Sequence, residues 1–140
     1  MDVVVTVPKD GWQDWLAEGH RANEPSLYVC PDYHWFGRGA VPPIVAGERV
    51  YIVAHGRLRG YALLIRLEQA KRGWQPEWWW PGCTWALVRR DRAVPVTIDE
   101  TIRGFPGWRV RWWPRTQEHY FPEWQTAGLP AQAHATPCRR

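Results

Sequence analysis

The sequence predicts a mainly β protein, a small mixed barrel of five or six mostly antiparallel strands with one or two short helices. Apolar runs of strand length recur along the chain, and turn residues separate them, with 13 prolines and 12 glycines in total. Strands and helices do not alternate, as they would around a parallel sheet. The 140 residues fit one domain, which we place at 1–124.

The first third of the chain predicts one strand and one helix. "MDVVVTVPKD" is typical of a first strand. "DGWQDWLAEGH" predicts a short amphipathic helix that begins at Asp10 and ends at Gly19. Residues 21–47 predict irregular chain with a brief strand at Ser26–Cys30, and the prolines exclude a central strand at 41–43.

The strongest structural signal is "GERVYIVAHGRLRGYALLIRLE", residues 47–68. Two apolar runs are joined by His55 and Gly56, which indicates a hairpin with a tight turn. His55 tolerates the left-handed backbone that such a turn needs, so its place requires no chemical role. Strict alternation along the second strand puts Arg57 and Arg59 on the side of Tyr61, facing water.

The remaining segments predict two or three further strands. "KRGWQPEWWWPG" is a connection, and "TWALVRRD" and "AVPVTI" are strands around a turn at 91–93. "GWRVRWW" is the last strand, and alternation assigns its side chains to two faces. The expected core face has Trp108, Val110 and Trp112, and the expected surface face has Arg109, Arg111 and Trp113. Residues 125–140 predict a disordered tail.

Charge and cysteine content narrow the partners and the compartment. The formal net charge is +4, with 16 arginines and only two lysines, which favours a polyanionic partner; a GC-rich genome explains such an arginine bias equally well. Three widely spaced cysteines indicate neither a disulfide framework nor a zinc site, and Cys30 with His34 has no second pair. We therefore expect a cytoplasmic protein without metal or cofactor, and no apolar run predicts contact with a membrane.

Twelve tryptophans exceed what the core of such a small domain needs. Most of them must fill the core, because tryptophan is usually buried. Aromatic side chains in loops can instead enclose an unpaired base. The candidates for base stacking are Tyr33, Trp35 and Trp79.

Arginines interleaved with aromatic residues suit a nucleic-acid surface, in which guanidinium groups contact phosphates. The candidates are Arg57, Arg59, Arg109 and Arg111. A solvated strand face with cation–π pairs explains the same pattern at least as well.

The hairpin resembles the central signature of PUA-like domains, in particular the ASCH and EVE branches. The elements that carry the resemblance are Gly47-Glu48, Val50–Val53, Gly56, Gly60 and Ala62. The resemblance implies a pseudobarrel with a cleft for RNA or for a modified nucleobase. It does not extend to the "GxKxxExR" pattern of ASCH enzymes, because "HWFGRGAVPPIVAG" lacks the lysine and the glutamate.

These observations predict a non-catalytic module that recognises RNA, another single strand or a modified or flipped base through an aromatic cage and an arginine patch. An ASCH-like nucleoside amidohydrolase or ribonuclease is the alternative, with Arg57 and three polar residues near its cleft. Those polar candidates are His55, Tyr61 and Glu100. A second alternative is a protein-interaction module with tryptophan-rich loops. The sequence leaves the ligand and the oligomeric state open.

Overall fold

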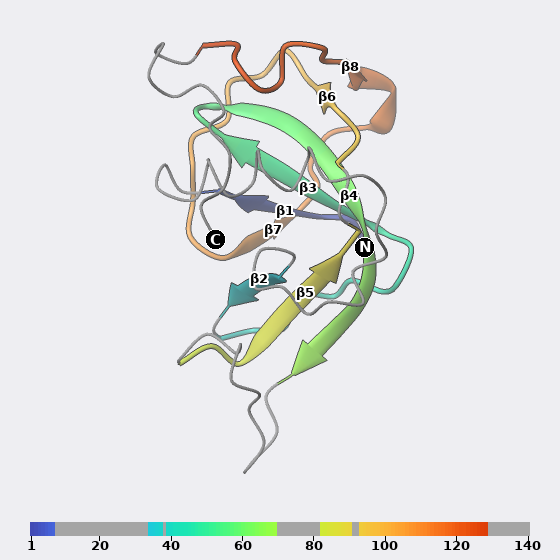
Figure 1. Cartoon of the computed structure of the whole chain (residues 1–140), viewed down its shortest axis with the longest axis vertical. Coiled ribbons are helices and arrows are strands. Elements are labelled where there is room, and N and C mark those ends of the chain that lie inside the picture. Colours follow the sequence, from blue (N-terminus) through green and yellow to red (C-terminus); the bar gives the residue numbers. More distant parts are fainter. Residues whose placement is uncertain (8–33, 38, 70–81, 91–92, 129–140) are drawn as a thin grey trace, which may run out of the picture.

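The computed structural model describes residues 1–7, 34–37, 39–69, 82–90 and 93–128 (Figure 1). Within them the chain is mainly β, as predicted, with strands in two sheets. The strands are β1 (Val3–Thr6), β2 (His34–Gly37), β3 (Arg49–Ala54), β4 (Arg57–Gln69), β5 (Trp85–Arg89), β6 (Val96–Thr97), β7 (Trp108–Val110) and β8 (His119–Tyr120). The helical element of this part is a single 3-10 turn, Arg115–Gln117, and the helix expected at 10–19 lies outside the described residues.

The larger sheet has the strand order β2-β5-β4-β3-β1-β7, and β6 pairs with β8 in a small second sheet. β1 runs parallel to β3, whereas the other ladders are antiparallel, so a mostly antiparallel arrangement is confirmed. Figure 1 shows β4 as a long curved strand that reaches from the β3 side of the sheet to β5. In the described part of the chain, no ladder joins the end strands β2 and β7, so this sheet is open.

The predicted hairpin is the centre of this sheet. β3 and β4 pair from Arg49 with Leu63 to Ala54 with Arg57. His55 and Gly56 form the turn with φ of 49° and 76°, the left-handed values that a tight hairpin turn requires. The local prediction for this turn is therefore confirmed.

A β-bulge in β4 corrects the predicted strand faces. Ile52 pairs with Gly60 while Val53 pairs with Leu58, which leaves Arg59 as the extra residue. The extra residue reverses the alternation, so Leu58 shares a core cluster with Tyr51 and Tyr61. The prediction that Arg57 and Arg59 lie on the side of Tyr61 is therefore wrong.

Gly60 is where a neighbouring segment crosses β4 closely. A Cβ at this position would lie 2.6 Å from the carbonyl oxygen of Val94, which is closer than real Cβ contacts. Val94 and Tyr61 exchange two backbone hydrogen bonds there, of 3.0 and 2.7 Å. Glycine at 60 thus lets the chain before β6 pack directly on the hairpin.

Both faces of the central strands are buried, because alternate residues enter two core clusters. The first cluster contains Val3, Val5, Val7, Ile44, Val50, Ile52, Ala54, Leu64, Trp85 and Leu87. The second contains Val4, Tyr51, Val53, Leu58, Ile98, Ile102, Phe105 and Trp113. The second cluster draws on residues after β6, so residues 98–105, together with Trp113, cover one face of the sheet.

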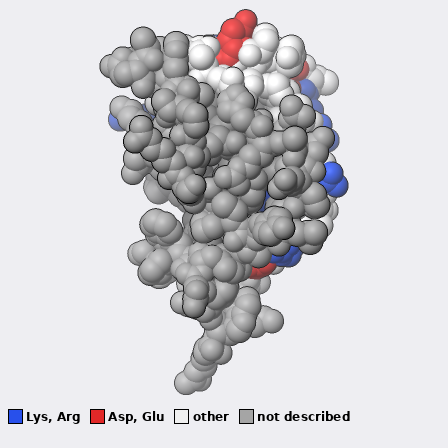
Figure 2. Space-filling model, viewed as in Figure 1, with Lys and Arg blue, Asp and Glu red and all other residues white. Residues whose placement is uncertain are grey.

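Two other segments differ from the predictions. β2 falls within the stretch expected to be irregular, and it pairs with β5 from His34 with Val88 to Gly37 with Trp85. β7 ends at Val110, and β8 follows it, so "GWRVRWW" is neither one continuous strand nor the last one. Residues 125–128 are described and follow β8 in turns. In the view of Figure 2, most of the visible basic side chains of the described residues lie along the right-hand edge.

Candidate functional site

A row of five aromatic rings extends from the sheet to the molecular surface. Its successive centroid distances are 6.3 Å, 4.9 Å, 5.1 Å and 5.5 Å. In order, the rings of this aromatic row belong to Phe105, Trp112, Trp113, Tyr51 and Tyr61. Their planes are tilted or edge-to-face, the arrangement that ring quadrupoles favour. A guanidinium covers each end of the row, Arg109 at 4.4 Å from the Phe105 centroid and Arg49 at 4.0 Å from that of Tyr61.

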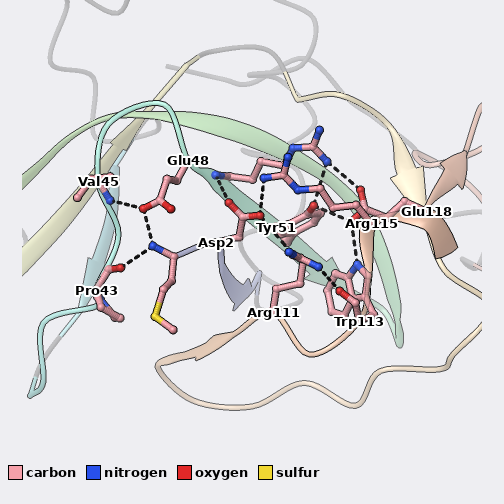
Figure 3. Close-up of polar contacts among 11 residues, drawn as sticks. Asp2, Pro43, Val45, Glu48, Tyr51, Arg111, Trp113, Arg115 and Glu118 are labelled. Carbon is pink, nitrogen blue, oxygen red and sulfur yellow. Dashed lines mark hydrogen bonds and ion pairs between the residues drawn. The ribbon is translucent and has the colours of Figure 1, made fainter.

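The inner part of the aromatic row is fixed by Glu118 (Figure 3). Its Oε2 accepts hydrogen bonds from the Tyr51 hydroxyl at 2.6 Å and from Trp113 Nε1 at 2.9 Å. Its Oε1 accepts one from Arg49 Nη1 at 2.9 Å, which also forms an ion pair. We call these four residues the Glu118 network. Burial of Tyr51, together with its bond to Glu118, raises the pKa of the phenol to about 12.

Asp2 joins the start of the chain to the same region. Its Oδ1 accepts the Arg49 amide at 2.9 Å, and its Oδ2 accepts Arg111 Nε at 3.2 Å and Arg115 Nη2 at 2.7 Å. Burial opposes ionisation of Asp2, but the hydrogen bonds from Arg49, Arg115 and Arg111 outweigh it, so its pKa lies below the ordinary value. Arg111 also donates to the Trp113 carbonyl, so these arginines attach the segment after β7 to the sheet.

Trp112 is the ring of the aromatic row that is open to solvent. Trp112 is 43% exposed, and its Nε1 donates to Glu100 Oε2 at 2.7 Å. Arg109 is exposed and lies over Phe105, and no carboxylate in the described part of the chain pairs with it. We call Glu100, Phe105, Arg109 and Trp112 the Trp112 surface. It combines an accessible ring with a cation and an anion.

Backbone contacts hold the loop between β6 and β7, which carries Glu100 and Phe105 of the Trp112 surface. The Ile102 amide donates to the Gly56 carbonyl at 2.8 Å, which anchors the loop to the hairpin turn. The Phe105 amide donates to Thr6 Oγ1 at 3.2 Å, which anchors it to β1. Glu100 and Phe105 are therefore presented by a loop that is attached to the hairpin turn and to β1, whereas Arg109 lies in β7 and Trp112 just after it.

Tryptophans 112 and 113 correct the predicted faces of this segment. Trp113 is only 4% exposed, whereas Val110 and Trp112 are exposed. The prediction extended strand alternation from Trp108 to Trp113, but the strand ends at Val110 and the chain turns after it. Trp108 is half-buried and packs against the first core cluster, as predicted for a core side chain.

Among the four predicted phosphate-binding arginines, Arg59 has no exposed surface. Its Nε donates to the Ala54 carbonyl at 2.9 Å and its Nη1 to the Trp124 carbonyl at 3.0 Å. Burial and the neighbouring Arg57 lower its pKa to about 10. In this structure Arg59 holds the chain after β8 against the hairpin, so it is not part of a phosphate-binding surface.

The other three arginines lie in separate surroundings. Arg57 is half-buried and lies over the ring of Phe121, 4.4 Å from its centroid. Arg111 is engaged by Asp2, and its side chain is 23% exposed. Arg109 is the exposed member, on the ring of Phe105. The described contacts thus support one member of the predicted patch as a surface group, not a continuous patch.

The predicted polar cleft residues are also apart. His55 is in the hairpin turn, Tyr61 is half-buried between Tyr51 and the Arg49 guanidinium, and Glu100 is on the Trp112 surface. Among the base-stacking candidates, the backbone of Trp35 belongs to β2 rather than to a loop. The side chain of Trp35, and all of Tyr33 and Trp79, lie outside the described residues.

Sequence reasoning missed Glu118, Trp112 and Phe105 as members of one site. Glu118 meets Tyr51 and Arg49 across 67 and 69 residues of chain, and no local spacing indicates such a pairing. No local signal places Trp112 at the surface, since the six residues between Gly107 and Pro114 are enough for an ordinary strand.

A scan against protein-family models found no match for this chain, and searches of curated proteins and of solved structures found none either. Among the described residues, no group of three His, Cys, Asp or Glu side chains is placed to hold a metal ion. The same part of the chain contains no helix that is long and apolar enough to cross a membrane.

Proposed function

We propose that this protein is a binding module for single-stranded RNA or another strand with unpaired or modified bases. The observation that carries the proposal is the Trp112 surface, in which an exposed indole and an exposed guanidinium both contact the ring of Phe105. A base stacks on the indole, and Arg109 contacts the adjoining phosphate. The aromatic row behind Trp112 supports the ring from inside the molecule.

The PUA-like pseudobarrel belongs to the same proposal. Its support is the central hairpin, with its left-handed turn at His55-Gly56 and the close approach at Gly60. These are the positions at which the sequence resembles that superfamily. In this proposal the curved β4 and the two-stranded β6-β8 sheet continue the barrel beyond the open six-stranded sheet.

Binding without catalysis is the version that the described contacts favour. The residues of the enzyme hypothesis have separate partners: Arg57 contacts Phe121, Tyr61 contacts Tyr51, and Glu100 contacts Trp112. General acid–base chemistry requires such groups within hydrogen-bond reach of one substrate. A binding surface requires only an accessible ring and a neighbouring charge.

Fluorescence anisotropy of a labelled nine-nucleotide uridine strand tests this function. We expect saturable binding that weakens as salt rises, because phosphate contacts release counterions. Trp112→Ala is expected to weaken binding by about 5- to 150-fold, the range that corresponds to the loss of one stacked base. Arg90→Gln is the matched control, since this exposed arginine follows β5, which is separated from β7 by three strands.

The proposal fails if neither this strand nor strands that contain the other bases bind. It also fails if Trp112→Ala binds as tightly as the unchanged protein. If Arg90→Gln weakens binding as much as Trp112→Ala does, the affinity comes from net charge and not from the Trp112 surface.

A further inference from the structure

Glu100 places a carboxylate at the edge of the exposed indole. Its Oε2 accepts the Trp112 N–H at 2.7 Å, which fixes the carboxylate beside the ring. Its Oε1 has no hydrogen-bond partner among the described residues, and the residue is exposed. An ionised carboxylate only accepts hydrogen bonds, with about four lone-pair positions on its two oxygens. The edge of a base stacked on Trp112 would therefore meet an acceptor.

We infer that the base held on Trp112 is guanine in preference to adenine, cytosine or uracil; this rests on the proposed function. The Watson–Crick edge of guanine has two adjacent donors, N1–H and the N2 amino group, which the free Oε1 and the remaining lone pair of Oε2 can accept. Adenine and cytosine have one donor beside a ring nitrogen that accepts, and uracil has one donor between two carbonyl oxygens. Each of these three edges turns an acceptor toward Glu100, which is unfavourable.

The two opposite charges of the Trp112 surface determine the orientation in which a strand binds. Arg109 lies on Phe105, whereas Glu100 is bonded to Trp112, so the cation and the anion are attached to different rings. A phosphate is attracted to Arg109 and repelled by Glu100. The strand therefore binds with its phosphate at Phe105 and its base edge at Glu100, which is the orientation that the guanine preference requires.

Three labelled nine-nucleotide strands test this inference, an all-uridine strand and two in which the central base is guanine or adenine. We expect the guanine strand to bind about tenfold more tightly than the other two, within the range for a bidentate base contact. Glu100→Gln is expected to abolish that difference while the all-uridine strand still binds. Glu123→Gln, an exposed glutamate after β8, is the matched control and is expected to keep the preference.

The outcomes separate this inference from the function on which it rests. If all three strands bind equally and Trp112→Ala weakens each of them, the guanine preference is wrong and the binding function stands. If Glu100→Gln keeps the guanine preference, another group reads the base and the role of Glu100 is wrong. If no strand binds, the proposed function itself fails. Chemical denaturation of Glu100→Gln checks that the variant remains folded.

Discussion

Trp112 and Trp113 are neighbours in the sequence but have opposite surroundings. Each donates its indole N–H to a glutamate, at 2.7 Å to Glu100 and at 2.9 Å to Glu118. Trp113 is 4% exposed and its glutamate side chain 6%, whereas Trp112 is 43% exposed and Glu100 is on the surface. A tryptophan–glutamate hydrogen bond thus occurs once in the core and once at the solvent-exposed surface.

These two environments decide which pair stabilises the fold and which is available for a ligand. A buried donor or acceptor that loses its partner costs its full desolvation energy, whereas an exposed one is satisfied by water. Removing either member of the buried pair must therefore lower the free energy of unfolding. Removing either member of the exposed pair must leave it nearly unchanged. The exposed pair is consequently the one whose interactions are available for binding.

The largest expected effect on stability comes from truncating the buried tryptophan, Trp113, and it contrasts with the effect of truncating Trp112. Trp113→Ala is expected to lower the free energy of unfolding by about 4 kcal/mol, because it opens a cavity in the second core cluster. Trp112→Ala is expected to lower it by less than about 1 kcal/mol, as for other exposed sites. Urea denaturation measures both, and Trp113→Phe replaces the alanine variant if that variant does not fold. Equal losses for the two sites would contradict the comparison.

The glutamates give a second, smaller contrast. Glu118→Gln is expected to cost about 2 kcal/mol, because Tyr51, Trp113 and Arg49 lose a charged acceptor inside the molecule. Glu100→Gln is expected to remain within about 0.5 kcal/mol of the unchanged protein. The same denaturation experiment compares them. A Glu118→Gln variant that is as stable as Glu100→Gln would show that the Glu118 network does not stabilise the fold.

Asp2 predicts how the buried region responds to acid. Its pKa is lowered in the folded state, so its contribution is present above the ordinary carboxyl pKa and is lost as the pH falls through the folded value. Asp2→Asn is expected to cost about 1 kcal/mol near pH 7, since its arginine partners are partly solvated. We expect this cost to shrink below about pH 4 in denaturation curves. A cost that does not change with pH would contradict the ionised role of Asp2.

Arg109 gives the smallest expected effect on stability and a specific effect on binding. Arg109→Gln is expected to change the free energy of unfolding by less than about 0.5 kcal/mol. It is expected to reduce the slope of log affinity against log salt by about 0.7, the value for one phosphate on a single strand. Anisotropy titrations at several salt concentrations measure the slope, with Arg90→Gln as control. An unchanged slope would exclude a phosphate contact at Arg109.

The parts of the fold that could be predicted depend on local chemistry. The turn at His55-Gly56 follows from the need for left-handed residues in a tight hairpin, and β1 and β5 follow from short apolar runs. The bulge at Arg59 could not be predicted, because a single extra residue has no distinct sequence signal, yet it reverses the alternation between Leu58 and Gly60. Arg59, the extra residue, is fully buried.

The candidate site was predicted only in part, because its contacts join distant segments. Arg109 and Glu100 were named from the sequence, and both lie on the Trp112 surface. Trp112 itself was assigned to the core, since alternation was extended beyond the true end of β7. The carboxylate of Glu118, which holds the inner half of the aromatic row, pairs with residues of β3 that are far away in the chain.

The most direct test of the division between the two tryptophans is the affinity of Trp112→Ala for a labelled single strand, measured on the folded protein. We predict an affinity loss of at least about fivefold, the lower end of one stacked base, with the urea midpoint nearly unchanged. Unchanged affinity in a folded Trp112→Ala variant would contradict the assignment of this exposed ring to binding.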